Sequence, residues 1–373
     1  MLRIAIVGCG KIADAHASQI QRIVGCEIVG ACDREPLMAR QLAERFSIPH
    51  ACGDLSWLLE EVRPDVVHIT TSPQSHFAIG KECLENGAHV YIEKPFTIHG
   101  AEAEELVAIA ERVGRLVTVG HDDQFRHAAR RMRELVRGGY LGGPPVHMDS
   151  FYCYELGDSG YARALLRNKN HWIRRLPGGL LQNIISHGIA RISEFFTTES
   201  PRVVAHGFVS PMLRQMGETE LIDELRVIVS EDQRMTAYFT FSSQMQPSLH
   251  QFRIYGPRNG LLLDQDNETL IRLRGSRYKS FLEQFVPPVG FAAQHLGNLG
   301  RNLRTFLAND FHPKAGMKFL IESFYRSIAG EEPVPIPYPE ILRTSRIMDQ
   351  IFAQISMEPA GAAPDRAAVC VQP

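Results

Sequence analysis

Two groups of polar residues in this chain have the types and spacing that proton transfer requires. Glu93-Lys94-Pro95 follows a short apolar run, and Asn183 and His187 lie four residues apart in a segment with helical periodicity. A lysine ammonium can hydrogen-bond a hydroxyl that is losing its proton, and histidine is the usual proton acceptor near neutral pH. Because residues four apart share one face of a helix, an amide and an imidazole can converge there on one ligand. Each group also has a simpler interpretation, as a solvated lysine and as a histidine that satisfies a buried carbonyl.

A glycine-rich turn near the N-terminus has the spacing of a dinucleotide-binding site. The segment Gly8-Cys9-Gly10-Lys11-Ile12-Ala13 is a G-x-G-x-x-A sequence between an apolar run and a helical pattern. The first glycine permits a tight turn, the second lets the backbone approach a pyrophosphate, and the small alanine lets the helix pack on the strand. The helix amides would then face the phosphates. A purely structural turn is the alternative.

The acidic residue that completes this pattern is Asp33, 20 residues after Ala13 and at the end of the next predicted strand. A carboxylate at this position accepts hydrogen bonds from the adenosine ribose hydroxyls, which favours NAD over NADP. The adjacent Arg34 leaves NADP as the alternative, because its guanidinium can either cover the adenine or pair with a 2′-phosphate.

The elements that must position these residues change in kind along the chain. Through the first 120 residues, apolar runs alternate with helical patterns, which is typical of βαβ units around a parallel sheet. We predict strands at 3–7, 27–32, 66–70, 89–92 and 116–119, and helices at 11–24, 36–46, 54–62, 75–87 and 99–113. After residue 145 the strands come in succession, as in an antiparallel sheet. We predict them at 146–154, 202–209, 221–230, 234–242, 249–255 and 260–264, with helices at 179–197, 293–309, 313–329 and 339–356.

These patterns predict an α/β protein of two domains, as a chain of 373 residues favours. Residues 1–122 are predicted to form an N-terminal Rossmann domain with a doubly wound parallel sheet. Residues 123–356 are predicted to form a C-terminal α+β domain that has a large, mostly antiparallel sheet and binds the substrate. The Ala/Pro-rich residues 357–373 are predicted to be a disordered tail.

Composition excludes several classes of function. A formal net charge of -2 offers no general attraction for nucleic acid or an anionic membrane. The seven cysteines are scattered without a CxxC pair, and the 15 histidines show no HExxH spacing, so we predict no disulfide framework and no metal site. No signal peptide or membrane-spanning segment is predicted. We therefore expect a cytoplasmic protein with a small-molecule partner.

The order of the motifs resembles the Gfo/Idh/MocA family, the group of glucose-fructose oxidoreductase and inositol dehydrogenase. The glycine turn and Asp33 are followed by a Thr-x-Pro-x-x-His segment, by Glu-Lys-Pro, and by a Gly-Gly-x-Leu-x-Asn-x-x-x-His segment that ends at His187. The likeness extends to about residue 355. It implies a Rossmann domain, an open second sheet, and a homo-dimer or homo-tetramer formed through that sheet.

The resemblance also implies roles for individual residues. Lys94 would position and polarise the reacting hydroxyl, and His187 would relay its proton while a hydride passes to the nicotinamide. The implied cofactor contacts are Gly8, Gly10, Lys11, Ile12, Asp33, Arg34, Thr71, Pro73, His76, Glu93 and Lys94. For the substrate we predict contacts from Asn183, Trp172, Tyr152, His121 and Arg174.

Two departures from the family pattern bear on the substrate. Asn183 stands where relatives often have Asp, and the sequence from Gly120 to Phe125 stands where they commonly carry Asn or Arg residues directed toward nicotinamide or substrate. In addition, residues 160–192 contain basic but no acidic side chains. A basic surface beside the site would favour an anionic ligand such as a uronic acid or a nucleotide sugar, unless these charges pair elsewhere or face water.

The sequence thus predicts an NAD(P)-dependent dehydrogenase that acts on a secondary alcohol of a sugar, sugar acid, nucleotide sugar or cyclitol. One alternative is a redox-neutral lyase, epimerase or glycosidase that oxidises its sugar transiently. A second alternative is a non-catalytic NAD-binding regulatory protein.

Overall fold

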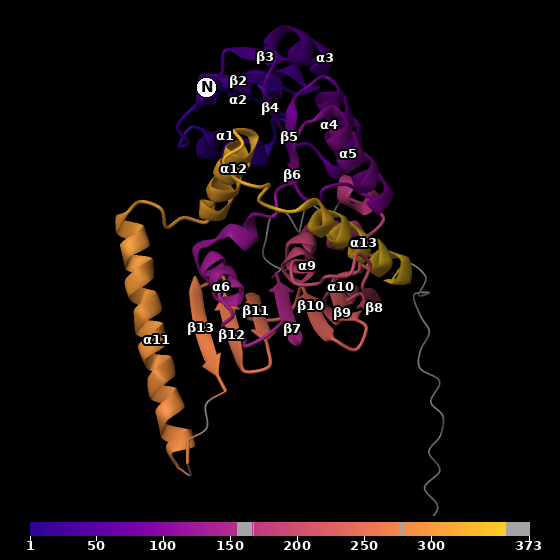
Figure 1. The fold of residues 1–373 in the computed structure, drawn as a ribbon. Helices are drawn as coiled ribbons and strands as arrows, with labels where there is room; N and C mark the ends of the chain where they lie inside the picture. The colour runs from indigo at the N-terminus through magenta and orange to yellow at the C-terminus, as the bar shows by residue number, and fades with distance from the viewer. Residues whose placement is uncertain (155–165, 167, 276–277, 280, 356–373) are drawn as a thin grey trace, which may run out of the picture.

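The computed structural model describes residues 1–373 with the exception of 155–165, 167, 276–277, 280 and 356–373. The predicted tail lies outside the described residues, as do Arg163 and Arg167, two of the basic residues of the segment 160–192. Figure 1 shows two layered halves, one above the other, with the C-terminal helices crossing between them.

The N-terminal half is built on a parallel sheet of six strands in the order β3-β2-β1-β4-β5-β6. The strands are β1 (Leu2–Val7), β2 (Cys26–Cys32), β3 (His50–Cys52), β4 (Val66–Ile69), β5 (His89–Ile92) and β6 (Val117–Val119). Five of these were predicted, and β3 was missed. This order brings the carboxyl ends of β1 and β4 side by side, where the strand order reverses and where such sheets bind ligands. The predicted doubly wound Rossmann sheet is confirmed.

Helices cover both faces of this sheet and bury its β-branched residues. They are α1 (Lys11–Ile20), α2 (Pro36–Phe46), α4 (His76–Glu85) and α5 (Gly100–Val113), with short turns α3 (Leu55–Trp57), η1 (Leu58–Val62), η2 (Pro73–Ser75) and η3 (Asp122–Phe125). The bounds of α2 agree with prediction because proline stands at its first position and Ser47, with φ of 54°, ends it.

The second half contains a sheet of seven strands in the order β13-β12-β11-β7-β10-β9-β8. All neighbours are antiparallel except β7 and β10, which are parallel. The strands are β7 (His147–Cys153), β8 (Arg202–Phe208), β9 (Glu224–Glu231), β10 (Met235–Ser242), β11 (Leu249–Tyr255), β12 (Asn259–Asp264) and β13 (Thr269–Arg274). The large, mostly antiparallel sheet is confirmed, with β13 as an edge strand that the sequence did not predict.

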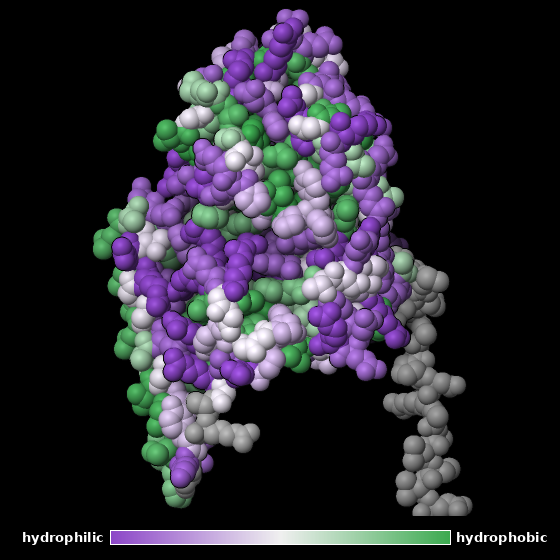
Figure 2. Space-filling view, viewed as in Figure 1, coloured by the Kyte–Doolittle hydropathy of each residue, from purple (hydrophilic) through white to green (hydrophobic). Residues whose placement is uncertain are grey.

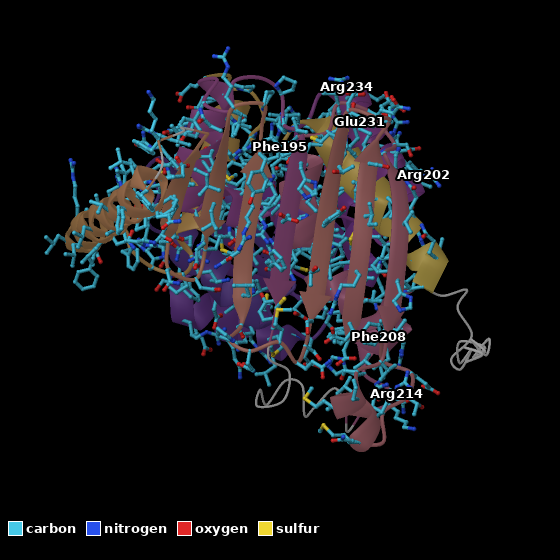
Figure 3. All side chains as sticks on the ribbon, turned by 90° about the horizontal axis from the view of Figure 1, so that it is seen from below. Phe195, Arg202, Phe208, Arg214, Glu231 and Arg234 are labelled. Carbon is cyan, nitrogen blue, oxygen red and sulfur yellow. The ribbon has the colours of Figure 1, made fainter. Side chains whose placement is uncertain are left out.

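One face of this sheet is covered by helices and the other is open. Strands β8, β9 and β10 alternate buried and exposed residues. The buried side of the whole sheet packs against the helices α6 (His127–Arg137), α8 (Gly179–Ile184), α9 (Ser186–Ser193) and α13 (Tyr338–Ile355). The other side carries Val204, Ile228 and Tyr238, each about half exposed. Figure 3 views the strands from this side, with Arg202 and Phe208 at the two ends of β8 and α13 behind the sheet. The short helices α10 (Pro211–Gln215) and η4 (Trp172–Arg175) complete this half.

The C-terminal helices connect the two halves. Met317, Leu320, Ile321 and Phe324 of α12 (Ala315–Ile328) belong to the hydrophobic core of the Rossmann half, although the sequence grouped them with the second domain. Helix α13 joins the Rossmann core through its first turn and the second core through its later turns. The described helices include none that is both long and apolar enough to span a bilayer. The boundary at residue 122 stays a prediction.

Candidate active site

A cleft lies along the carboxyl ends of the Rossmann strands and has the size and lining expected for a dinucleotide. Its volume is about 560 Å³. Five of the predicted cofactor residues line it: Gly8, Gly10, Asp33, Arg34 and Thr71. A Cβ built at Gly10 would meet no atom within 4 Å, so the backbone at the N-terminus of α1 is open toward the cleft. These residues fit a pyrophosphate placed against the helix amides.

The turn at Gly8 requires glycine for two reasons. Its φ is +94°, and an added Cβ would lie 2.6 Å from Thr71 Cγ2 and 2.7 Å from the Thr71 backbone nitrogen. The Asp33 carboxylate holds the same turn, because it accepts a hydrogen bond of 2.7 Å from the Cys9 backbone nitrogen and another from that of Glu35. Asp33 therefore joins the turn at the end of β1 to the end of β2.

We expect Gly8→Ala to weaken NAD binding at least tenfold, because the methyl group must displace Thr71 from the wall of the cleft. Calorimetric titration with NAD measures this loss. Gly25→Ala is the matched control, since Gly25 has a similar φ of +87° but open space around it. Both variants share the backbone strain of about 1–2 kcal/mol. Equal NAD affinity in the two variants would show that the turn at Gly8 is not part of the cofactor site.

The other predicted cofactor residues are not among those that line this cleft. His76 is fully buried, and its ring nitrogens lie 2.8 Å from the Pro95 carbonyl oxygen and 3.1 Å from that of Thr71. The imidazole thus ties the segment after β4 to the Glu-Lys-Pro segment after β5. Pro73 begins the turn η2 and is buried. Lys11 and Ile12 begin α1 beside the cleft. A direct cofactor contact from any of these residues stays a prediction.

Lys94 reaches across to the second half of the chain. It follows β5, and its Nζ donates a hydrogen bond of 2.7 Å to the backbone carbonyl of Asn183. The predicted single helix 179–197 is wrong, because α8 ends at Ile184 and α9 begins at Ser186. The last carbonyls of a helix lack intrahelical partners, so the end of α8 offers an acceptor to the ammonium. Lys94 is thereby fixed close to His187, the second residue of α9.

Behind Lys94, a buried chain of hydrogen bonds holds Glu93. Glu93 Oε1 lies 2.8 Å from His16 Nε2, His16 Nδ1 lies 2.9 Å from His68 Nδ1, and His68 Nε2 lies 2.8 Å from the Tyr325 hydroxyl. Burial would raise the pKa of Glu93, but its hydrogen bond with His16 and the charges nearby lower that pKa to about 2. An ionised Glu93 beside Lys94 favours the ammonium form of the lysine. Sequence analysis did not identify His16, His68 or Tyr325.

We expect His16→Leu to destabilise the protein by about 3 kcal/mol at neutral pH, because it leaves the buried Glu93 carboxylate without its partner. Because folding lowers the pKa of Glu93, its ionised carboxylate stabilises the folded wild-type protein at pH values above the pKa of Glu93 in the unfolded chain. This stability is lost as the pH falls toward 2. Denaturant unfolding across this acidic range measures the difference. Gln19→Leu, on the same helix and also buried, is the control. A His16→Leu loss no larger than that of the control would contradict this role.

Two carboxylates face the imidazole of His187 from η3. The Asp122 Oδ1 and Asp123 Oδ2 atoms each lie 3.9 Å from His187 Nδ1, which has no hydrogen-bond partner among the described residues. This distance is too long for a hydrogen bond, and the interaction is electrostatic. The Tyr152 hydroxyl donates a 3.0 Å hydrogen bond to Asp123 Oδ2. The sequence has Asn183 where relatives often have a carboxylate, and in the structure two carboxylates of η3 lie near His187.

Burial and mutual repulsion set the charges of this group. Burial raises the pKa of Asp122 and the Asp123 carboxylate raises it further, to about 7. Burial acts on Asp123 in the same sense, but the positive charges of His187, Arg191 and Arg126 lower its pKa to about 2. Burial lowers the pKa of His187 to about 4, although Asp123 opposes the shift. The imidazole is therefore neutral near pH 7, where Asp122 titrates.

The same three side chains are close enough to share a cation, since their ligand atoms lie within 4.8 Å of one another. Positive charge is already supplied, because Lys94 faces Asp122 and Arg191 faces Asp123. We assign no metal to this group, and the absence of a metal site stays a prediction.

The predicted substrate residues divide into two sets. Tyr152 and His121 lie beside His187, with ring centroids 6.0 and 5.9 Å from it, and Gln74 donates to the Trp172 carbonyl from the opposite half. Arg174 is different, because its Nη2 lies 2.5 Å from the Glu218 carboxylate and both side chains are largely buried. Its charge is neutralised within the fold. Pairing with an acid elsewhere is the alternative that the sequence left open, and a substrate contact from Arg174 stays a prediction.

The likeness to known proteins agrees with this architecture. Residues 2–121 match the Gfo/Idh/MocA family model, which is described as an oxidoreductase family with an NAD-binding Rossmann fold. D-glucoside 3-dehydrogenase of Escherichia coli (strain K12) is 32% identical over 142 residues, which cover 38% of this chain and 40% of that protein. Myo-inositol 2-dehydrogenase of Thermotoga maritima is 21% identical over 315 residues, covering 83% of this chain and 88% of that protein.

The solved structures extend the likeness to almost the whole chain. The WlbA dehydrogenase of Bordetella pertussis, solved in complex with NADH and UDP-GlcNAcA, superposes with a TM-score of 0.75 and 14% identity over 95% of each chain. At this identity the match shows the fold alone. Three similar curated dehydrogenases are aligned over 40%, 65% and 36% of their lengths, which is less than two thirds.

Proposed function

We propose that this chain belongs to the Gfo/Idh/MocA oxidoreductases, which it resembles, and that it is an NAD-dependent dehydrogenase that oxidises a secondary alcohol of a carbohydrate-like substrate. The observation that carries the proposal is that Lys94 of the Rossmann half hydrogen-bonds the Asn183 carbonyl of the second half, which places its charge close enough to act on the imidazole of His187. Bound NAD would accept the hydride at the nicotinamide ring. The chain's own residues would bind the alcohol and remove its proton.

The two basic side chains have different tasks in this proposal. Burial lowers the pKa of Lys94, but the charges of Glu93 and Asp122 oppose that shift and favour the ammonium. The ammonium donates to the substrate oxygen and stabilises the negative charge that grows there as the carbon loses its hydride. His187, neutral near pH 7, accepts the hydroxyl proton at its ring. Glu93 and the Asn183 carbonyl hold the lysine in position.

We further propose that Asp122 and Asp123 replace the carboxylate that relatives often carry at position 183. An imidazole that gains a proton at one nitrogen becomes a strong donor at the other, and Nδ1 of His187 faces both carboxylates. Asp123, held by Tyr152 and Arg191, would stabilise the imidazolium. Asp122, whose pKa is about 7, would take up the second proton.

NAD is the proposed cofactor, with NADP as the alternative. Asp33 and Arg34 both line the cleft. A carboxylate at this position disfavours a 2′-phosphate, and the hydrogen bond that Asp33 accepts from the Cys9 amide keeps its side chain in place. Similar structures are described with NAD+ or NADH bound.

The proposed substrate is a sugar, cyclitol or nucleotide sugar, by analogy with the names of the relatives. A preference for an anionic substrate rests on Lys169 and Arg175, since Arg174 is paired with Glu218. We place the enzyme in the cytoplasm, where reduced thiols fit the six free cysteines of the described residues.

The function is tested by mixing the protein and NAD with a panel of sugars, uronic acids, nucleotide sugars and cyclitols. We expect NADH absorbance to appear with one chemical class. Conversion of a sugar without net NADH would support the redox-neutral alternative, which a 26% identical relative named glycosyl hydrolase family 109 protein 2, of Akkermansia muciniphila, makes worth assaying. Tight NADH binding without any turnover would support a regulatory protein.

The open face of the second sheet is the proposed interface for a dimer or tetramer. Its centre carries Val204, Ile228 and Tyr238, which would otherwise leave apolar area in water. This assignment rests on the family resemblance.

A further inference from the structure

Helix α11 (Leu282–Leu307) has the opposite polarity to a normal surface helix. Its only buried side chain is that of Asn298, which accepts from the Leu270 backbone nitrogen and donates to the Leu270 carbonyl. Gln294 makes the same pair of bonds with Arg272, and Asn302 donates to the Asn267 carbonyl. Amide side chains of α11 thus satisfy the free backbone edge of β13. The polar side of this helix faces the protein.

The apolar side of α11 faces solvent and has a regular spacing. Eight residues, hereafter the α11 seam, follow one another at alternating intervals of three and four: Leu282, Phe285, Val289, Ala292, Leu296, Leu299, Leu303 and Phe306. Apart from the alanine, each is between 54% and 70% exposed. Figure 2 shows hydrophobic side chains along this helix at the edge of the molecule. Intervals of three and four are the a and d positions of a heptad repeat, which requires another helix as its partner.

We propose that the α11 seam packs against α11 of a second copy of this chain as an antiparallel coiled coil. The seam is complementary to itself in that orientation, because Leu282 then opposes Phe306 and the small Ala292 opposes Leu296. Charge favours the same orientation. Glu283 lies at the start of the helix and Arg301 and Arg304 near its end. Antiparallel pairing brings opposite charges together, whereas parallel pairing sets like charges against each other.

The size and position of the helix suit this partner. Its 26 residues span about 39 Å, and the seam offers apolar area on the order of the 800 Å² that each partner contributes to a standard interface. Figure 1 shows α11 along the outer edge of the molecule beside β13, with one end reaching beyond the sheet. The contact is separate from the open sheet face. A protein that uses both contacts is a tetramer built as a dimer of dimers.

The test is the mass of the full chain in solution, measured by light scattering and sedimentation over a range of concentrations. We expect Leu296→Lys/Leu303→Lys to halve the mass of wild-type, because two buried charges would be placed in the seam of each helix. Leu307→Lys is the control, since this leucine is 83% exposed and lies one position beyond the seam. Circular dichroism and NAD binding confirm that each variant is folded.

The outcomes separate the possible partners. An unchanged mass in the double variant, or an equal loss in the Leu307→Lys control, would overturn the proposal. Ile228→Lys probes the sheet face independently. If the mass falls in Ile228→Lys but not in the double variant, the oligomer forms through the sheet. A third outcome is that the wild-type protein binds phosphatidylserine vesicles while the double variant does not, with the same mass for both proteins. That outcome would assign the seam to a membrane surface and would also overturn the proposal.

Discussion

Lys94→Ala is expected to lower kcat by about 10² or more while NAD affinity stays nearly unchanged. In the proposed mechanism the ammonium stabilises the alkoxide-like oxygen of the transition state, and Lys94 does not line the cleft assigned to the dinucleotide. Loss of a contact made only in the transition state lowers kcat and kcat/KM together. Steady-state kinetics and a calorimetric NAD titration on the same preparation measure both quantities.

A matched control distinguishes lost chemistry from a disturbed fold. Lys81 is an exposed lysine of the same half, paired with Glu105, so Lys81→Ala should retain turnover. Added primary amines should restore part of the activity of Lys94→Ala by replacing the missing ammonium. Unchanged turnover in Lys94→Ala would remove this residue from the mechanism.

Asp122→Asn is expected to reduce turnover and increase stability, both in a pH-dependent manner. If the ionised Asp122 accepts the second proton of His187, wild-type kcat/KM rises through about pH 7, where this acid titrates. In the variant kcat/KM should no longer rise through this pH range, and above about pH 7 it should be about 10²-fold lower than in wild-type. The apparent pKa belongs to the cluster rather than to one residue. Its members are Asp122, Asp123, His187, Lys94, Glu93, His121, Lys314, Arg126, Arg191 and Tyr152.

The stability change has the opposite sign. The folded-state pKa of Asp122 is raised above its usual 3.8, so folding loses stability as the pH rises between about 4 and 7. An uncharged Asn avoids this cost, and the variant should be roughly 2–4 kcal/mol more stable than wild-type above pH 7 and similar to it near pH 4. Denaturant unfolding at the two pH values measures this. A variant that is less stable at both, with an unaltered pH profile, would leave Asp122 a structural residue.

Local pattern was sufficient to predict the elements that carry the cofactor site. The glycine turn, Asp33 and the flanking strands are adjacent in sequence or fixed by the parallel order of the sheet, and the structure brings them to one cleft. Strand β3 was missed because it has only three residues, none of them buried. Strand β13 was missed because its arginines weaken the hydrophobic signal at the edge of the sheet.

The chemistry around His187 depends on contacts between distant segments. The sequence places Asp122 and Asp123 some 65 residues before His187, and only the packing of η3 against α9 brings their carboxylates to the imidazole. Likewise, the position between α8 and α9 is Ile185, and neither a proline nor a glycine stands there to indicate a break in the helix. Arg174 gives a second example, since its basic segment lacks nearby acids in sequence while Glu218 reaches it in space.

The central claim is that Lys94 and His187 meet at one hydroxyl beside the nicotinamide. A crystal structure with NAD and the active member of the substrate panel tests it most directly. We predict density in which the reacting carbon lies against nicotinamide C4, with Lys94 Nζ and His187 Nε2 both within hydrogen-bonding distance of its hydroxyl. A substrate bound with either side chain turned away from that hydroxyl would contradict the account.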